Sequence, residues 1–301
     1  MRIGVATATV LWALVLYAAE TSPCWAQAQT ASSDAPVPPS SSGPPASGLD
    51  EAATASVGGL SPICTDRPTK SNYACTVDAG HFQYESDIFN SGFLRLDGVT
   101  TDTAYLTNPT FQYGLTSDTD IEANISPAEI VRTRQGAHQT IIAGVGDLYL
   151  RFKYQFINVE DGTLQGTILP YVKIPTARLG IGDGAVEGGL IVPVNYKFND
   201  VLTLTIDPEV DELKDTVGAG HHLNTAQLVN LAVSLPKHLT LYGELWGDWN
   251  FDPTGVVRQY SVDTAAAYAV NPRLQLDVGV NVGLNRYTPG AQVYIGISQK
   301  F

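Results

Sequence analysis

The last eleven residues of the chain, AQVYIGISQKF, alternate between two kinds of side chain and end in an aromatic residue. Successive side chains of a β-strand point to opposite faces of the sheet. One face of this segment is therefore apolar and suits lipid, whereas the other is polar or small and suits a wetter interior. The apolar face holds Val293, Ile295, Ile297 and Phe301, and the other face holds Tyr294, Gly296, Ser298 and Lys300.

The same two-residue period recurs from about residue 76 to the end of the chain. The clearest example is GVGDLYLRFKYQF, in which leucines and aromatic residues alternate with charged and polar ones. An even number of strands, with alternating short and long connections, is typical of a single-chain bacterial membrane barrel. We therefore predict an all-β fold, a transmembrane antiparallel β-barrel of about 12 strands over residues 61–301. The predicted strands span residues 76–88, 103–114, 119–126, 143–157, 163–175, 186–198, 201–211, 223–235, 239–250, 258–270, 273–285 and 291–301.

The expected connections differ in length at the two ends of the barrel. Short turns such as GLTSD and PKH alternate with longer segments such as NSGFLRLDGVTTD and SPAEIVRTRQGAHQT, which we expect to be outer loops. A soluble sandwich or a large lipocalin-like barrel stays open as an alternative, and in that fold the apolar face would be the core. Aromatic residues near the strand ends are expected on the lipid-facing side, as interface girdles: Tyr105, Tyr113, Tyr154, Phe156, Tyr196, Phe198, Trp249 and Tyr268.

The N-terminus has the features of an exported protein. Residues 1–28 combine Arg2, an apolar run and an Ala26-Gln27-Ala28 cleavage site, which is the pattern of a signal peptide. Residues 29–60 are rich in Pro, Ser and Ala, and we expect a disordered periplasmic tether. Together with Phe301, which resembles the signal that the barrel-assembly machinery recognises, this predicts a bacterial outer-membrane protein surrounded by lipid.

Charge and cysteine content narrow the possibilities further. The chain carries 17 Lys and Arg against 30 Asp and Glu, so nucleic acid is not an expected partner. Charged residues make up only 16% of the chain, which is low for a soluble domain. Cys64 and Cys75 remain after removal of the signal peptide. Because exported proteins meet an oxidising compartment, we predict a disulfide between them; two free thiols are the alternative.

Two segments resemble a known family. They are CTDRPTKSNYACTVDAGHFQYESD at 64–87 and LPYVKIPTARLGIGDGAVEGGLIVPV at 169–194, the latter preceded by GVGDLYLRFKY. These motifs resemble the outer-membrane, transporter-like family named for a meta-pathway of phenol degradation, and the likeness extends over roughly residues 60–301. The resemblance implies a channel or transporter for small aromatic or hydrophobic solutes.

The polar register of the strands supplies the candidate pore-lining residues. Most of them are acidic, which predicts a preference for cations or neutral solutes over anions. The interior could equally be filled, which would make the chain a non-conducting structural barrel. The candidates are Asp147, Tyr149, Arg151, Lys153, Tyr171, Lys173, Glu187, Asp207, Glu209, Asp211, Glu244, Trp246 and Asp277.

An enzyme is the less favoured class. An outer-membrane hydrolase would need a nucleophile beside a base, and Ser126 or Asp215 near an outer-loop histidine is the only pattern that offers one. No cofactor fingerprint or catalytic motif occurs. We expect no metal site, because adjacent residues of a strand, such as His221 and His222, point apart. The sequence does not identify the solute, the direction of transport or the oligomeric state.

Overall fold

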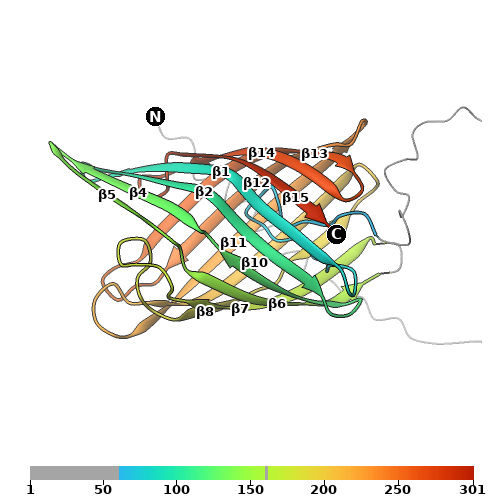
Figure 1. The fold of residues 1–301 in the computed structure, drawn as a ribbon, viewed down its shortest axis with the longest axis horizontal. Coiled ribbons are helices and arrows are strands. Elements are labelled where there is room, and N and C mark those ends of the chain that lie inside the picture. The colour runs from blue at the N-terminus through green and yellow to red at the C-terminus, as the bar shows by residue number, and fades with distance from the viewer. Residues whose placement is uncertain (1–60, 160–161) are drawn as a thin grey trace, which may run out of the picture. The chain divides into compact units, whose positions relative to one another are not determined.

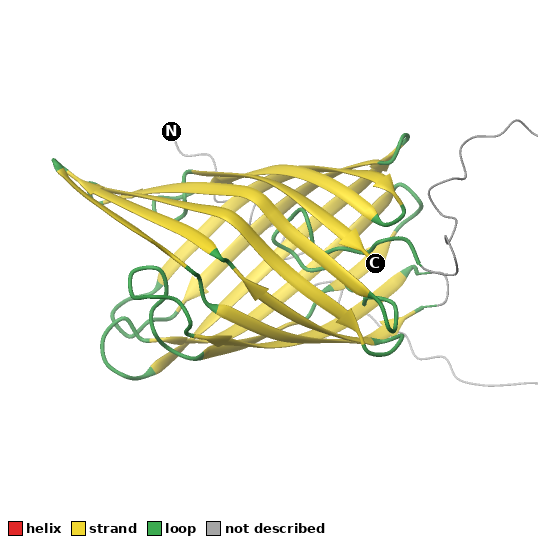
Figure 2. Cartoon of the chain, in the orientation of Figure 1, coloured by secondary structure: helices red, strands yellow, loops and turns green. Residues whose placement is uncertain are grey.

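The computed structural model describes residues 61–159 and 162–301. The predicted signal peptide and tether lie outside the described residues. Within them, every regular element is a strand (Figure 2). No helix in the described part of the chain is long and apolar enough to cross a membrane.

Fifteen strands form one antiparallel sheet that closes on itself, because β1 pairs with β15 on one side and β2 on the other (Figure 1). The strands are β1 (Phe82–Leu96), β2 (Val99–Gly114), β3 (Thr119–Ile125), β4 (Ala128–Gln135), β5 (His138–Gly144), β6 (Leu148–Asn158), β7 (Leu164–Ile174), β8 (Glu187–Ile191), β9 (Val194–Lys197), β10 (Leu202–Lys214), β11 (His221–Leu235), β12 (Leu239–Asn250), β13 (Val257–Asn271), β14 (Leu274–Gly283) and β15 (Ala291–Lys300).

Three pairs of these strands are halves of one barrel strand. β3 continues into β4, β5 into β6, and β8 into β9, with short breaks that include Pro127 and Pro193. Proline lacks a backbone N–H, so it interrupts the ladder at these points. Counting each pair once gives a closed antiparallel barrel of 12 strands, which confirms the predicted fold class and strand number.

Two predicted outer loops are wrong, because the structure has strands there. β1 and β2 continue through NSGFLRLDGVTTD and turn at Asp97-Gly98, whose φ angles of 49° and 82° suit a tight hairpin turn. β4 and β5 form a second hairpin through SPAEIVRTRQGAHQT. Figure 1 shows both hairpins reaching beyond the other strands. Asp-Gly is itself a hairpin signal, and the sequence analysis passed over it. The first predicted strand also began too early, since β1 begins at Phe82.

The barrel has its polar residues inside and its apolar residues outside. On β6, Leu150, Phe152, Tyr154 and Phe156 point outward and are 40–45% exposed. Charged residues on the opposite register are buried; Asp207 and Asp263 are fully covered. A soluble barrel has the reverse arrangement, so this distribution favours the membrane barrel over the soluble alternative.

We name the two ends of the barrel by their connections. The terminal end is where β1 begins and β15 ends, and the turns there are short. Phe301 lies at this end, where its ring is 5.9 Å from that of Phe82 and its N–H donates to the Phe82 carbonyl. The loop end carries the two long hairpins and the connections 175–186, 215–220, 251–256 and 284–290.

Candidate functional site

The segment that precedes β1 lies inside the barrel. Residues 61–81 enter at the terminal end, where Lys300 Nζ donates to the carbonyls of Ser61 and Pro62 and pairs with Asp78 at 2.9 Å. In Figure 1 this blue segment loops between the walls. We call residues 61–81 the plug.

The plug contains no regular strand, so its backbone needs partners from the wall. Carboxylates of inward-facing strand residues accept many of these hydrogen bonds. Glu244 on β12 accepts from the N–H groups of Lys70 and Ser71, both at 3.0 Å. Asp207 on β10 accepts from the Asn72 N–H at 2.8 Å, and Asp120 on β3 accepts from the Val77 N–H at 3.0 Å. Acidic wall residues therefore fix the path of the plug.

Two cations of the plug pair with buried acids of the wall. Arg67 makes two hydrogen bonds to Asp277 on β14 and a third to Asp87 on β1. Lys70 Nζ lies 2.9 Å from Asp263 on β13 and 4.3 Å from the centre of the Trp246 ring. These contacts neutralise part of the acidic excess that the sequence predicts for the interior.

A third ion pair runs in the opposite sense, from the wall to the plug. Lys153 Nζ on β6 lies 2.8 Å from Asp66 and 3.2 Å from Glu122 on β3. Asp66 also accepts from the N–H of Tyr73 at 2.7 Å, which bends the plug back on itself. Because both cations and anions of the plug pair with the wall, these contacts fix which plug residue lies beside which strand residue.

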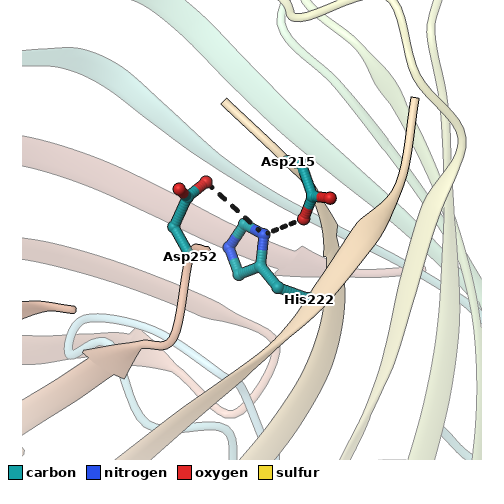
Figure 3. A group of neighbouring side chains, drawn as sticks. All are labelled: Asp215, His222 and Asp252. Carbon is teal, nitrogen blue, oxygen red and sulfur yellow. Dashed lines mark hydrogen bonds and ion pairs between the residues drawn. The ribbon is translucent and has the colours of Figure 1, made fainter. Parts of the chain in front are cut away.

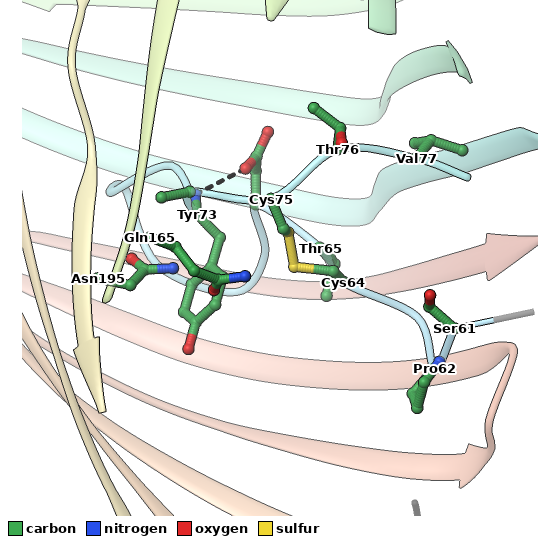
Figure 4. Close-up of a disulfide and its surroundings, with 12 residues drawn as sticks. Ser61, Pro62, Cys64, Thr65, Tyr73, Cys75, Thr76, Val77, Gln165 and Asn195 are labelled. Carbon is green, nitrogen blue, oxygen red and sulfur yellow. Dashed lines mark hydrogen bonds between the residues drawn. A yellow bond between two sulfur atoms is a disulfide. The ribbon is translucent and has the colours of Figure 1, made fainter. Parts of the chain in front are cut away.

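A disulfide joins Cys64 to Cys75 across the plug, with their Cα atoms 6.4 Å apart. Figure 4 shows that the bond links two stretches of the same segment, with Ser61 and Pro62 before it and Thr76 and Val77 after it. The closed loop contains Asp66, Arg67 and Lys70. The bond therefore holds the charged groups of the plug in one compact unit and does not attach that unit covalently to a strand.

Two adjoining cavities lie between the plug and the loop end, with volumes of about 320 and 450 Å³. The first is lined by Asp66, Arg67 and Lys70 of the plug. The second contains Tyr105, Tyr149 and Tyr171. The residues common to both are Asn108, Asn124, Arg151, Ile191 and Glu209. A polar space that includes tyrosine rings thus extends from the plug toward the loop end.

The connection 175–186 borders this space through Ile181 and is tied to the wall by polar contacts. Asp147 accepts from the Ala177 N–H at 2.9 Å, and Lys173 Nζ lies 2.8 Å from Asp183 and 2.6 Å from Glu187. Burial raises the pKa of Asp183, but the hydrogen bonds from Lys173 and the Ala185 N–H outweigh it and lower this pKa to about 2. The loop is therefore held by an ionised carboxylate near neutral pH.

The structure places all the pore-lining candidates on the inner face, in three groups. One group contacts the plug, another lines the cavities, and a third supports their outer border. The residues that contact the plug are Lys153, Asp207, Glu244, Trp246 and Asp277. The residues that line the cavities are Asp147, Tyr149, Arg151, Tyr171 and Glu209. The residues at the outer border are Lys173, Glu187 and Asp211, and Asp211 accepts a 2.6 Å hydrogen bond from the Tyr171 hydroxyl.

Tyr105 was predicted on the lipid-facing side, and that prediction is wrong. The pairing of β2 with β4 shifts register between Tyr105 and Thr107, which is a β-bulge. One extra residue reverses which side chains face inward beyond that point. Tyr105 consequently lines the larger cavity, whereas Phe111 and Tyr113, which follow the bulge, are exposed on the outside.

The sequence analysis missed the plug and its charged residues. The predicted disulfide loop stood just before the first predicted strand, and Asp66, Arg67 and Lys70 within it were given no role. A signal was available: this segment carries two cations within a cysteine-closed loop, and the predicted interior had an unbalanced acidic excess. Charges buried in a barrel need partners, and the segment next to the first strand could supply them.

Comparison with known proteins fits this architecture. Residues 65–301 match the model of a family described as "Putative MetA-pathway of phenol degradation". The chain belongs to this family. The match begins inside the plug, so plug and barrel are both part of the family's shared sequence. No curated protein matches the sequence.

Three solved structures to which this chain is similar all have low sequence identity with it. The COG4313 outer membrane channel from Pseudomonas putida F1 is 12% identical, with a TM-score of 0.61 over 76% of this chain and 98% of that one. The NanC porin is 10% identical, with a TM-score of 0.46 over 74% of this chain and 100% of that one. The translocator domain of NalP from Neisseria meningitidis is 10% identical, with a TM-score of 0.43 over 73% and 88%. The first likeness supports the barrel fold, and the other two carry no further argument.

Proposed function

We propose that this protein is an outer-membrane channel for small solutes, closed at rest by its own N-terminal plug. The observation that carries the proposal is the pair of polar cavities between the plug and the connection 175–186. A barrel with a purely structural role has no need of an interior space bordered by a separate segment. The solved outer membrane channel of the same fold supports this assignment.

The plug is suited to move as a unit. Its disulfide is internal, and its described contacts with the strands include hydrogen bonds, ion pairs and two cation–π contacts. These contacts are polar, so water can satisfy the same groups once the plug shifts, which is not possible for a covalent bond. Displacement of the plug would open the interior while the barrel wall keeps its own closed hydrogen-bond ladder.

The lining favours small aromatic solutes that carry polar groups over purely hydrophobic ones. Tyr149 and Tyr171 lie 6.1 Å apart between ring centres and offer flat surfaces for stacking. Arg151 and Glu209, which border both cavities, supply a cation and an anion for polar substituents. A volume of 320–450 Å³ lies within the range of small-molecule sites.

A hydrophobic solute is the second candidate, because the unpaired edge of β5 could offer it a way out through the wall. Among the described strands β5 pairs with β4 alone, so no ladder joins it to β7 or β8 at the loop end. The connection 175–186 covers this edge, where Gly180 leaves room for the Ile142 side chain. Movement of that connection would expose a side exit toward lipid.

The site gives no support to a hydrolase. The Ser126 hydroxyl donates to the Thr107 carbonyl at 3.1 Å, and no histidine contacts it among the described hydrogen bonds. Asp215 does lie 3.0 Å from His222, but no hydroxyl or thiol contacts that ring among the described hydrogen bonds. A nucleophile without an adjacent base is not activated. We therefore assign the protein to the transporters and not to the enzymes, with lipid, the assembly machinery and a small solute as its partners.

Liposome swelling tests the proposed function. Vesicles containing the refolded mature protein are diluted into isotonic solutions of neutral aryl glucosides and of a sugar of similar size. The proposal predicts faster swelling with the aromatic solutes for a variant whose plug is loosened by Arg67→Gln and Lys70→Gln. Swelling equal to that of empty liposomes for both the unmodified protein and this variant would assign a non-conducting structural role.

A further inference from the structure

A second cluster of chemically active side chains lies at the loop end, away from the cavities. Asp215 follows β10, His222 is on β11 and Asp252 follows β12. The Nδ1 atom of His222 lies 3.0 Å from Asp215 Oδ1 and 3.6 Å from Asp252 Oδ2 (Figure 3). One atom from each residue lies within 4.8 Å of the other two. Three segments that are separate in sequence thus bring one nitrogen and two oxygens to a single point.

The local sequence holds each carboxylate in place. Asp252 accepts hydrogen bonds from the Thr254 N–H and hydroxyl through Oδ1 and from the Thr216 N–H through Oδ2. Asp215 packs so closely against Gly220 that a Cβ there would collide with Oδ2. Glycine at position 220 therefore makes room for the carboxylate. The cluster is pre-organised before any ligand arrives, which lowers the entropic cost of binding.

The charges of the cluster are not balanced by a basic residue. Among the described ion pairs, Asp215 and Asp252 have His222 as their partner and no Lys or Arg. Their side chains are 15% and 5% exposed, so water screens them only in part. A protonated His222 offers one Nδ1 hydrogen to two carboxylates, and its Nε2 is buried without a described partner. The ring is therefore not an ordinary, fully hydrogen-bonded core histidine.

We propose that Asp215, His222 and Asp252 bind a divalent transition-metal cation of the Zn²⁺ class at the loop end of the barrel. Zinc takes imidazole nitrogen and carboxylate oxygen at about 2.0–2.2 Å, which sets neighbouring donor atoms about 3–3.5 Å apart in a tetrahedral site. The observed separations from Nδ1 are 3.0 and 3.6 Å. Three protein ligands leave a fourth position for water.

This cation would join three strand ends through two connections. Asp215 belongs to the connection 215–220 and Asp252 to the connection 251–256, and His222 anchors both to the wall. A bound ion would hold the connections 215–220 and 251–256 together at the loop end of the barrel. The sequence analysis expected no metal because it considered the two cysteines and the His221-His222 pair but not His222 with residues of other segments. On β11 the two histidines do alternate in burial, and the carboxylates beside His222 come from other segments.

Calorimetric titration of the EDTA-treated, refolded mature protein with ZnCl₂ tests this site. We expect saturable binding of one ion per chain that His222→Ala weakens at least about tenfold. His221→Ala is the matched control: its ring is exposed, contacts the Val186 carbonyl at 3.3 Å and lies outside the cluster. This variant should bind zinc with an affinity within about twofold of that of the unmodified protein. A change of that size is clearly smaller than the tenfold loss expected when a ligand is removed.

A second readout separates a metal site from a simple ion pair. CoCl₂ bound by one imidazole and two carboxylates gives visible absorption bands, which His222→Ala should lose and His221→Ala should keep. If His222→Ala does not fold, as judged by heat-modifiable migration on gels, Asp215→Asn replaces it. The proposal is overturned if the unmodified protein shows no saturable binding, or if the cluster variant binds as tightly as the control. Neither result depends on whether the barrel transports a solute.

Discussion

Arg67 of the plug and Asp277 of β14 are 210 positions apart in the chain and are joined by two parallel hydrogen bonds of 3.0 and 2.8 Å. This fork-to-fork geometry is the strong form of an arginine–carboxylate pair. The Asp277 side chain is fully buried. The contact therefore connects the first described segment of the chain to one of the last strands, and it fixes the plug close to where the barrel closes.

Removal of Arg67 should loosen the plug. Arg67→Ala leaves Asp277 and Asp87 buried without their cation, a change that costs about 3–5 kcal/mol in comparable buried pairs. We expect the plug to leave its seat and become sensitive to trypsin after Lys70, while the strands stay resistant. Mass spectrometry of timed digests detects this cleavage. Arg286→Ala, which removes an exposed pair with Asp97, is the control. Equal protection of Lys70 in both variants would contradict the anchoring role.

The disulfide should keep the charged loop of the plug compact. With Cys64→Ser and Cys75→Ser together, a closed loop that is worth at most about 3 kcal/mol of chain entropy is lost. We expect the plug to exchange its amide hydrogens faster, with little change in the strands, by hydrogen-exchange mass spectrometry. Thiol labelling of the unreduced, denatured protein should modify neither cysteine. Two labelled cysteines would show that the bond does not form in the cell.

Glu209 and Asp207 should differ in their effect on ion selectivity. Glu209 borders both cavities, whereas Asp207 is fully buried and holds the Asn72 N–H of the plug. In a conducting state, Glu209→Gln should reduce cation preference at low salt, and Asp207→Asn should mainly loosen the plug. Reversal potentials in a salt gradient measure the first effect, and trypsin sensitivity at Lys70 measures the second. Anion preference in the unmodified protein would refute the charge argument.

The tie between Asp183 and Lys173 should be lost only in acid. The pKa of Asp183 is lowered to about 2, so the ion pair is fully present above the ordinary aspartate pKa of about 4 and disappears as the pH falls through about 2. Because the Asp183 side chain is 40% exposed, the contribution is no more than about 1 kcal/mol. The melting temperature of Asp183→Asn should be slightly below that of the unmodified protein near neutral pH. That difference should vanish as the pH falls from about 4 to about 2; its loss already near pH 6 would contradict the assignment.

The alternation of side chains was sufficient to predict the barrel, its strand number and the inner register, because a period of two has only two possible phases on each strand. The predictions failed where the phase changed. The bulge beside Tyr105 inserts one residue into β2, and although Pro109 follows four positions later, the alternation itself does not show where the extra residue lies. The hairpins at Asp97-Gly98 and Gly136 reach beyond the other strands, and a strand that projects past the barrel wall has no closed interior to impose the alternation.

The plug could not be derived from periodicity, because it has no repeating pattern. Its position depends on individual pairs such as Arg67 with Asp277 and Lys153 with Asp66, which join residues far apart in the chain. Only the charge balance of the interior pointed to such a partner. The cluster of Asp215, His222 and Asp252 was hidden for the same reason, since the three residues meet through the strand order and not through their spacing.

Single-channel conductance in a planar bilayer tests the central claim, that the N-terminal plug closes a solute channel. The unmodified mature protein should show small or rare openings, and the variant with Arg67→Gln and Lys70→Gln should show larger and more frequent steps. The control variant Arg286→Gln should behave like the unmodified protein. If the plug variant, correctly folded and with faster amide hydrogen exchange in residues 61–81 than the unmodified protein, conducts no more than the unmodified protein, then the plug does not gate a channel.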